Sequence, residues 1–193
     1  GQHMKDVLFD FMDEPGTRMD SIWWCFSSGN EANWPSRILP HIDKPSYNEW
    51  AEKGFDPVQF LMNESRRRGK EVFFSYRING TDSVDYDGKP VLSMKEAHPD
   101  WLMYTWGNNL YVNHTAPRHS GMWNFVFQGV RDYKLSILRE VAEDYEFDGM
   151  EIDLARDTPV LPPGHQWQHR EAMTDFMRSV RSMLLDIERR RGR

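Results

Sequence analysis

Cysteine is nearly absent from this chain: Cys25 is the only one among 193 residues. A single thiol excludes an intramolecular disulfide framework and any zinc site built from several thiolates. A single thiol does not indicate the cellular compartment, and we expect Cys25 to be a small buried side chain. Long apolar runs are missing too. No stretch approaches the roughly 20 apolar residues of a membrane span, and the N-terminus lacks the apolar segment of a signal peptide. We therefore expect no membrane partner.

The sequence also lacks a clustered excess of basic residues. The 24 Lys and Arg residues against 30 Asp and Glu leave a net charge of −6. Nucleic acids attract clustered basic side chains, so we expect no nucleic-acid partner. Hydrophobic residues make up 39% and aromatic residues 13% of the chain, which is typical of a soluble globular protein with a sizeable core. Residues 1–4 are interpreted as a remnant of cloning.

Apolar runs alternate with helical patterns along what we interpret as one domain, residues 1–193. Asp56 followed by Pro57 is an N-cap with proline at the first helical position, and it predicts a helix that ends at Gly69. Residues 79–123 have no clear period and are interpreted as a long functional loop. Two further helices are predicted at 130–145 and 170–190, and strands are predicted at 7–12, 21–26, 71–78 and 150–154. This order predicts a parallel sheet covered by helices.

Polar residues end two of the predicted strands, at the edge where parallel α/β sheets bind ligands. Because side chains alternate along a strand, Glu151 and Asp153 share one face of the fourth strand. Arg77 and Asn79 likewise share one face at the end of the third strand, and Arg156 follows the fourth. A buried carboxylate needs a partner or becomes neutral. Two interpretations therefore stand: these residues line a site, or they form a buried ion-pair network that supports the sheet.

A resemblance to a known family runs through the same region. The sequence FDGMEIDLAR at residues 147–156, preceded by GVRDY at 129–133, resembles a segment of the glycosyl hydrolase-like family ten and its bacterial relatives. The stretch from Asp56-Pro57 to RGK at 56–70 and the sequence HPDW at 98–101 resemble two further segments in the same order. Residues 21–30 are similar to the second-strand region of bacterial members.

The resemblance implies a (β/α) barrel of TIM type that acts on carbohydrate without a cofactor, with Asp153 as the leading catalytic candidate. Glycoside hydrolysis needs one carboxyl group to protonate the leaving oxygen and another as base or nucleophile, about 5 to 9.5 Å apart. Residues i and i+2 of a strand are about 6.6 Å apart, so Glu151 is a candidate partner. We expect Glu151 instead to orient Asp153 or Arg77, and the partner carboxylate to lie on another strand.

Four predicted strands make about half of an eight-stranded barrel, and a complete barrel takes about 250 residues. We therefore expect either the N-terminal portion of a longer barrel or a half-barrel that covers its open edges by self-association, because parallel strands are not left bare. A half-site in isolation is expected to lack activity.

Other side chains carry weaker signals. Trp106 and Trp123 either stack on sugar rings or pack in the core. His98 is a candidate substrate contact, and its alternative role is to cap a short helix. His165 and His169 have a spacing that a metal uses, but no carboxylate or thiolate completes the set, so no metal is expected. A metal-dependent hydrolase that uses His98 or His165 is the weakest of the functional hypotheses.

Two other functional hypotheses are stronger than the metal-dependent one. The first is a glycoside hydrolase of oligo- or polysaccharides in which Asp153 is acid/base or nucleophile. The second is a non-catalytic carbohydrate-binding or assembly protein built on a half-barrel, because a fold alone does not confer activity. In the first hypothesis, Glu151 supports the site and the residues that position substrate are Arg77, Asn79 and Arg156. The sequence identifies neither the sugar nor the cellular location.

Overall fold

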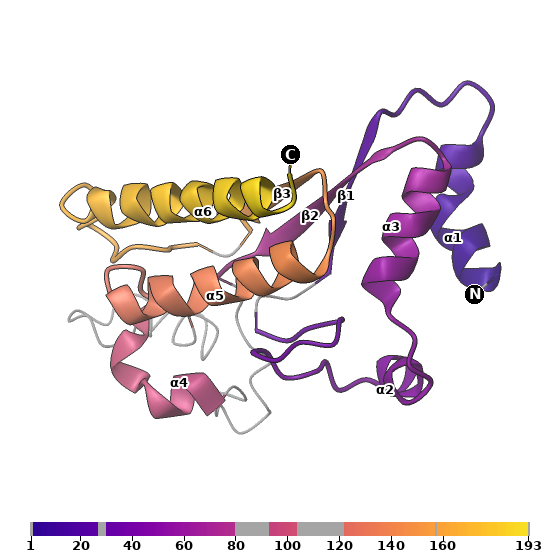
Figure 1. The fold of residues 1–193 in the computed structure, drawn as a ribbon. Helices are drawn as coiled ribbons and strands as arrows, with labels where there is room; N and C mark the ends of the chain where they lie inside the picture. The colour runs from indigo at the N-terminus through magenta and orange to yellow at the C-terminus, as the bar shows by residue number, and fades with distance from the viewer. Residues whose placement is uncertain (1, 27–29, 80–92, 104–121, 157, 193) are drawn as a thin grey trace.

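A computed structural model of the chain describes residues 2–26, 30–79, 93–103, 122–156 and 158–192 (Figure 1). The strands are β1 (Ser21–Cys25), β2 (Glu71–Arg77) and β3 (Gly149–Asp153). The helices are α1 (Gln2–Asp13), α2 (Pro45–Glu52), α3 (Pro57–Arg67), α4 (Ser93–Ala97), α5 (Gln128–Asp144) and α6 (Arg170–Arg190), with one 3-10 helix, η1 (Pro99–Trp101). Over these stretches, no helix has the length and apolar character needed to span a bilayer.

The described strands form one parallel sheet in the order β1-β2-β3. Parallel neighbours need a crossover connection, and here α3 lies between β1 and β2, and α5 between β2 and β3. In Figure 1, α5 and α6 lie side by side in front of the strands. Three of the four predicted strands and the three predicted long helices are confirmed to within a few residues. The α/β fold with a parallel sheet is thus confirmed, and the half-barrel stays a prediction.

Residues 7–12 are part of α1, so the strand predicted there is wrong. Phe9 and Met12 are buried, whereas Val7 and Phe11 are 61% and 47% exposed. Burial at a spacing of three residues is the pattern of a helix with one face on the core. A short apolar run does not by itself distinguish a strand from a buried helix face, and here the helix was the correct alternative.

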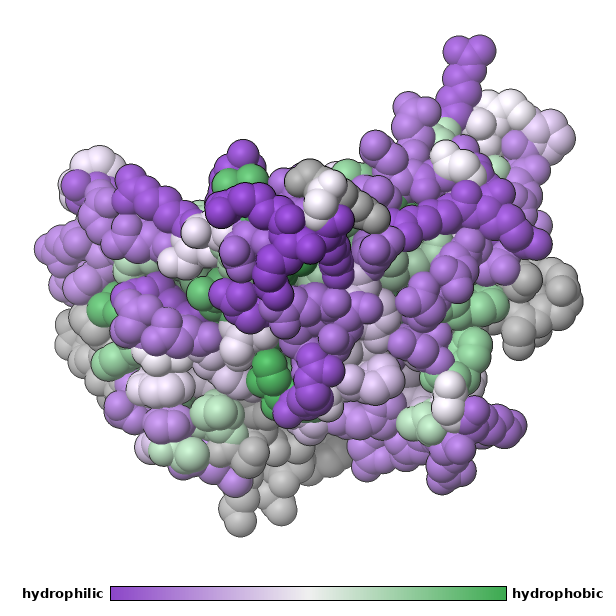
Figure 2. All heavy atoms as spheres, viewed as in Figure 1, coloured by the Kyte–Doolittle hydropathy of each residue, from purple (hydrophilic) through white to green (hydrophobic). Residues whose placement is uncertain are grey.

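The core lies between one face of the sheet and the helices. Val72, Phe74 and Tyr76 alternate along β2 on this face, and all three are 0% exposed. Phe74 packs edge-on against Trp34, with ring centroids 5.6 Å apart. The helices α3 and α5 add the apolar side chains Val58, Leu61, Val130 and Ile137. Hydrophilic residues dominate the outer surface on the side of α5 and α6 (Figure 2), so these helices are amphipathic, with their apolar faces toward the core.

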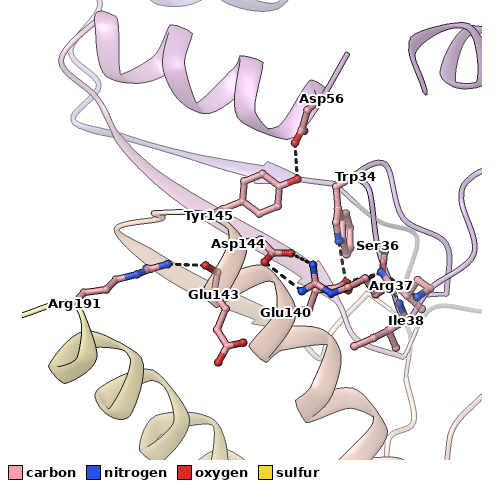
Figure 3. A network of polar contacts seen from close by, with 11 residues as sticks. Trp34, Ser36, Arg37, Ile38, Asp56, Glu140, Glu143, Asp144, Tyr145 and Arg191 are labelled. Atoms are coloured by element: carbon pink, nitrogen blue, oxygen red, sulfur yellow. Dashed lines mark hydrogen bonds and ion pairs between the residues drawn. The ribbon is translucent and has the colours of Figure 1, made fainter. Parts of the chain in front are cut away.

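The start of α3 is tied to the end of α5 through Asp56. Its Oδ1 accepts hydrogen bonds from the N–H groups of Val58 at 2.9 Å and Gln59 at 3.1 Å, which caps α3. Its Oδ2 accepts a hydrogen bond of 2.6 Å from the Tyr145 hydroxyl (Figure 3). Burial, together with that carboxylate, raises the pKa of the Tyr145 hydroxyl above its usual value. The Asp56-Pro57 sequence thus caps α3 and also joins it to the residue that follows α5.

The opposite face of the sheet is only partly covered within the described chain. Trp23 is 49% exposed and stacks on Phe73, with ring centroids 4.4 Å apart. The Phe73 ring lies over Gly149, where a Cβ atom would approach Cε1 of the ring to 2.5 Å. Cys25 is exposed, contrary to the expectation that it is buried. This is the face on which the two β3 carboxylates lie, because side chains alternate along the strand.

Candidate functional site

Asp153 is the last residue of β3, and the turn that follows holds its carboxylate. Oδ1 accepts hydrogen bonds from the backbone N–H groups of Ala155 and Arg156, both at 2.9 Å. Backbone donors orient a carboxylate firmly because they belong to the fold and have no side-chain freedom. Oδ2 makes no hydrogen bond to any described residue, and the side chain is partly buried. Asp153 therefore presents one anchored and one available oxygen at the end of the strand.

The sheet brings Arg77 and Glu151 next to Asp153. In the β2–β3 register, Arg77 is the partner of Asp153 and Ser75 is the partner of Glu151. Neighbouring strands are about 4.8 Å apart, so these side chains share one short stretch of a single sheet face. Within the described ranges, no ion pair joins Arg77, Glu151, Asp153 or Arg156 to one another. Arg77, Glu151 and Asp153 are thus neighbours on one sheet face, and the described contacts show no ion-pair network among them.

Asn79 and Trp123 are 0% exposed, and their polar groups already have protein partners. The Asn79 side-chain amide donates to the carbonyl of Pro159 at 2.7 Å, and its Oδ1 accepts from the backbone N–H of Trp123 at 2.8 Å. The indole N–H of Trp123 donates to Oδ1 of Asn30 at 3.0 Å. Because both side chains are fully buried, a substrate contact from either residue would require the surrounding packing to open.

His98 stacks on Trp101, with ring centroids 3.8 Å apart and planes 8° apart. Trp101 in turn covers Gly129 in the first turn of α5, where any Cβ atom would collide with the indole ring. The sequences HPDW and GVRDY therefore fit together as one packing unit. Arg156 is exposed, and its contact with Asp153 is made by its backbone N–H. Trp106 lies outside the described residues.

The histidines of the last loop show no metal-binding arrangement in the described stretches. Nδ1 of His165 lies 2.7 Å from Oε1 of Gln168 on the surface. No three His, Cys, Asp or Glu side chains gather at a point that suits a metal ion in the described part of the chain. The metal-dependent hypothesis therefore gains no ligand set there.

One buried carboxylate was not predicted from the sequence. Glu140 on α5 is 3% exposed and accepts hydrogen bonds from the Trp34 indole N–H at 3.2 Å, the Ser36 hydroxyl at 2.6 Å and the backbone N–H of Arg37 at 2.6 Å (Figure 3). A Glu within an amphipathic helical pattern normally predicts a solvated position, so the sequence carried no signal for it. Glu140 anchors the segment that follows β1 to α5.

The same segment borders a cavity of about 300 Å³ that no sequence motif indicated. Its other walls come from α2, the connection to α3 and the first residue of α3, and they include Tyr47, Trp50 and Phe55. None of its lining residues belongs to β2 or β3. The cavity is therefore separate from the strand ends that carry Asp153.

At the entrance to β3, Asp148 has a structural role. Its backbone N–H donates to the carbonyl of Val72 at 2.9 Å, and its Oδ2 accepts from the backbone N–H of Val72 at 2.8 Å. These two bonds set the position at which β3 begins beside β2. The FDGMEID segment thus combines framework residues at its start with the candidate site at its end.

Comparison with known proteins places these features in context. A family model described as glycosyl hydrolase-like 10 matches residues 5–167. The glycosyl hydrolase DigH of Escherichia coli is 28% identical over 162 residues, which cover 79% of this chain and 34% of DigH. The glycosyl hydrolase YngK of Bacillus subtilis is 27% identical over 132 residues, 64% of this chain and 22% of YngK. The chain spans about a third or less of the length of these curated relatives.

Two solved structures resemble the fold. Alpha-L-fucosidase isoenzyme 2 from Paenibacillus thiaminolyticus has a TM-score of 0.58 at 15% identity, and the match covers 86% of this chain and 25% of that one. The galactosidase domain of the alpha-galactosidase-sucrose kinase AgaSK has a TM-score of 0.53 at 14% identity, covering 84% and 21%. At such low identity the likeness is one of fold, and both neighbours are glycosidase domains.

Proposed function

The chain belongs to the glycosyl hydrolase-like 10 family, and on that premise we propose that it hydrolyses O-glycosidic bonds of oligo- or polysaccharides by carboxylate chemistry. The family match and the names of both curated relatives support a glycoside hydrolase-like function. Because the chain spans 34% of the length of DigH, the reaction is proposed for the chain together with the strands or partner that complete its sheet.

Asp153 is the proposed acid/base or nucleophile. It ends a strand at the edge where parallel α/β sheets bind ligands. The two backbone bonds to Oδ1 fix the plane of its carboxylate, and Oδ2 stays available to a glycosidic oxygen or an anomeric carbon. A fixed carboxylate with one open oxygen is what proton transfer or nucleophilic attack at a bound sugar needs. This geometry is the main structural support for the proposal.

Glu151 is proposed as a supporting residue and not as the second catalytic carboxylate. It lies two residues before Asp153, about 6.6 Å away along the strand, which is within the range of catalytic carboxylate pairs. However, its sheet partner is Ser75, so it lies one residue pair deeper than the Arg77–Asp153 pair. A sugar at the strand ends reaches Asp153 first. The partner carboxylate is therefore proposed to come from another strand.

Arg77 and Arg156 are proposed to position substrate from either side of Asp153. Arg77 is its sheet partner, and Arg156 follows it in the turn. Asn79 and Trp123, also predicted as substrate contacts, are proposed to support the site, since both are buried and hydrogen-bonded. His98 and Trp106 remain proposed substrate contacts.

Self-association, or completion by further strands, is proposed to cover the open face of the sheet. Trp23 and Phe73 form a stacked aromatic pair on this face, and Trp23 is half exposed. Aromatic pairs of this kind dominate cores and interfaces. Sedimentation of the 193-residue chain is expected to show a dimer or larger species, and a monomeric mass at high micromolar concentration would contradict self-association.

The alternative is a non-catalytic carbohydrate-binding or assembly protein on the same scaffold. In favour of it, no second catalytic carboxylate lies beside Asp153 on a neighbouring strand in the described sheet. The two functions differ in one property: an enzyme turns over its glycoside, whereas a binding protein retains it unchanged.

The test compares Asp153→Asn with Asp175→Asn, an exposed aspartate on α6 that serves as the matched control. Release of reducing sugar from a polysaccharide panel is measured for the chain and for the full-length product of its gene. For an enzyme, Asp153→Asn should lower kcat by about 10²–10⁴-fold while binding persists, and Asp175→Asn should change neither. Hydrolysis that is unchanged by Asp153→Asn would refute the assignment. Saturable binding by a wild-type protein without turnover would favour the alternative.

A further inference from the structure

A cavity of about 300 Å³ lies between α2, the start of α3 and the segment after β1. We propose that it is a second ligand site, distinct from the strand ends, which takes one uncharged sugar ring. A cavity of this size is at the lower end of the range of small-molecule pockets, about 300–1,000 Å³. The proposal does not depend on Asp153, because no lining residue belongs to β2 or β3.

Aromatic rings form one side of the cavity. Tyr47 and Trp50 meet edge to face with centroids 4.9 Å apart, and Trp50 and Phe55 do so at 5.7 Å. Edge-to-face packing fixes the rings against one another and leaves the face of one ring free of the other. Such rigid aromatic faces suit the apolar C–H face of a pyranose ring, at little cost in side-chain entropy.

Hydrogen-bonding groups without protein partners also lie around the cavity. Oδ1 of Asn33 is buried and has no hydrogen-bond partner among the described residues. Neither the Tyr47 hydroxyl nor the Trp50 indole N–H makes a hydrogen bond to another described residue. A buried polar atom without a partner is costly, so a ligand hydroxyl that reaches Oδ1 of Asn33 would relieve that cost. One acceptor and two donors around an aromatic wall match the mixed character of a sugar.

The absence of charged side chains from the cavity lining disfavours charged ligands. Its lining residues include no Asp, Glu, Lys or Arg, and His41 is the one titratable imidazole among them. A phosphate, a carboxylate or an ammonium group would therefore enter without a fixed counter-charge, which is unfavourable in a partly enclosed space. The expected ligand is uncharged.

The part of the wall that follows β1 is held in place by α5. Trp34 and Ser36 line the cavity, and both donate hydrogen bonds to the buried carboxylate of Glu140 on α5 (Figure 3). The Ser36 hydroxyl also accepts the backbone N–H groups of Ile38 and Leu39, at 3.1 and 2.9 Å. Because this wall is held from a long helix, little ordering is left for the ligand to impose, which favours binding.

The test is a titration of the ¹⁵N-labelled chain with methyl α-L-fucoside, methyl α-D-galactoside and methyl β-D-glucoside, followed through the tryptophan indole signals. Cyclohexanol serves as a ring of similar size with a single hydroxyl. At least one glycoside should move the Trp34 and Trp50 signals saturably, and more tightly than cyclohexanol does. Trp50→Ala should weaken that binding at least about tenfold. Trp167→Ala, which removes an exposed indole outside the cavity, should leave it unchanged.

Two further variants separate this site from the proposed function and from loss of folding. Asn33→Leu should weaken the glycoside and leave cyclohexanol binding unchanged, because it removes the acceptor and keeps the size of the side chain. Asp153→Asn should leave the indole shifts unchanged even if it abolishes hydrolysis. The proposal is overturned if no glycoside gives a saturable shift, if cyclohexanol binds as tightly, or if folded Trp50→Ala or Asn33→Leu protein binds glycoside like the wild type.

Discussion

Replacement of Gly149 by alanine should destabilise the protein through a single contact. The new Cβ would approach Cε1 and Cδ1 of Phe73 at 2.5 and 2.7 Å, well inside the normal separation of carbon atoms. Phe73 has Trp23 stacked on its ring at 4.4 Å, so the ring moves away only by displacing that partner. Trp23 is 49% exposed and does have room to move outward.

The expected cost follows from that geometry. Overpacking a well-filled position costs about 1–3 kcal/mol, and the freedom of Trp23 favours the lower half, about 1–2 kcal/mol. For a chain of this length each kcal/mol lowers Tm by about 2–4 °C, so a drop of roughly 2–8 °C is expected. Alanine has no intrinsic disadvantage relative to glycine in a strand, so backbone propensity does not explain a loss.

A double-mutant cycle isolates the contact. Urea unfolding is measured for the wild type, Gly149→Ala, Phe73→Ala and the double variant. Without the Phe73 ring, Gly149→Ala should cost less than about 0.5 kcal/mol, which gives a coupling energy of about 1 kcal/mol. An equal cost of Gly149→Ala in both backgrounds would show that the Phe73 contact is not the cause and would refute the reasoning.

Two further predictions concern buried polar contacts. Glu140→Ala should lower the free energy of unfolding by about 3 kcal/mol, because the Trp34 indole N–H and two further donors lose a buried charged acceptor. Urea unfolding measures this loss, and a value below about 1 kcal/mol would contradict the buried network. Tyr145→Phe should cost about 1–2 kcal/mol at pH 7, because Asp56 loses one donor. The pKa of Tyr145 is raised by folding, so this contribution is fully present below about pH 10, the unfolded value, and decreases above it. A difference between wild type and Tyr145→Phe that stays constant from pH 8 to 11 would contradict that account.

Much of the framework was predictable because burial follows a regular period in it. The β2 run has alternating side chains that are buried on one face, and α6 repeats apolar residues at helical spacing, so local pattern and tertiary structure agree. The strand prediction for residues 7–12 failed because a run of six residues contains too few periods to distinguish a strand from a helix face. The carboxylates of β3 were predicted together with Arg77 because strand ends in a parallel sheet meet at one edge.

The sequence could not predict the partners of the polar groups. Asp153 is held by the backbone N–H groups of Ala155 and Arg156, and no side-chain pattern in the sequence indicates backbone partners. Glu140 and Trp34 are 106 residues apart, and no local pattern relates them. The cavity likewise depends on how α2 lies beside the segment after β1, which is a property of packing and not of any motif.

The distance along the chain between Trp34 and Glu140 also bears on biosynthesis. A ribosome that adds about 5–20 residues per second needs roughly 5–20 seconds to reach Glu140 after it has made Trp34. Throughout that interval the Trp34 indole N–H, which is buried in the folded chain, lacks its carboxylate acceptor. We therefore expect the segment after β1 to reach its final position only after α5 has been made.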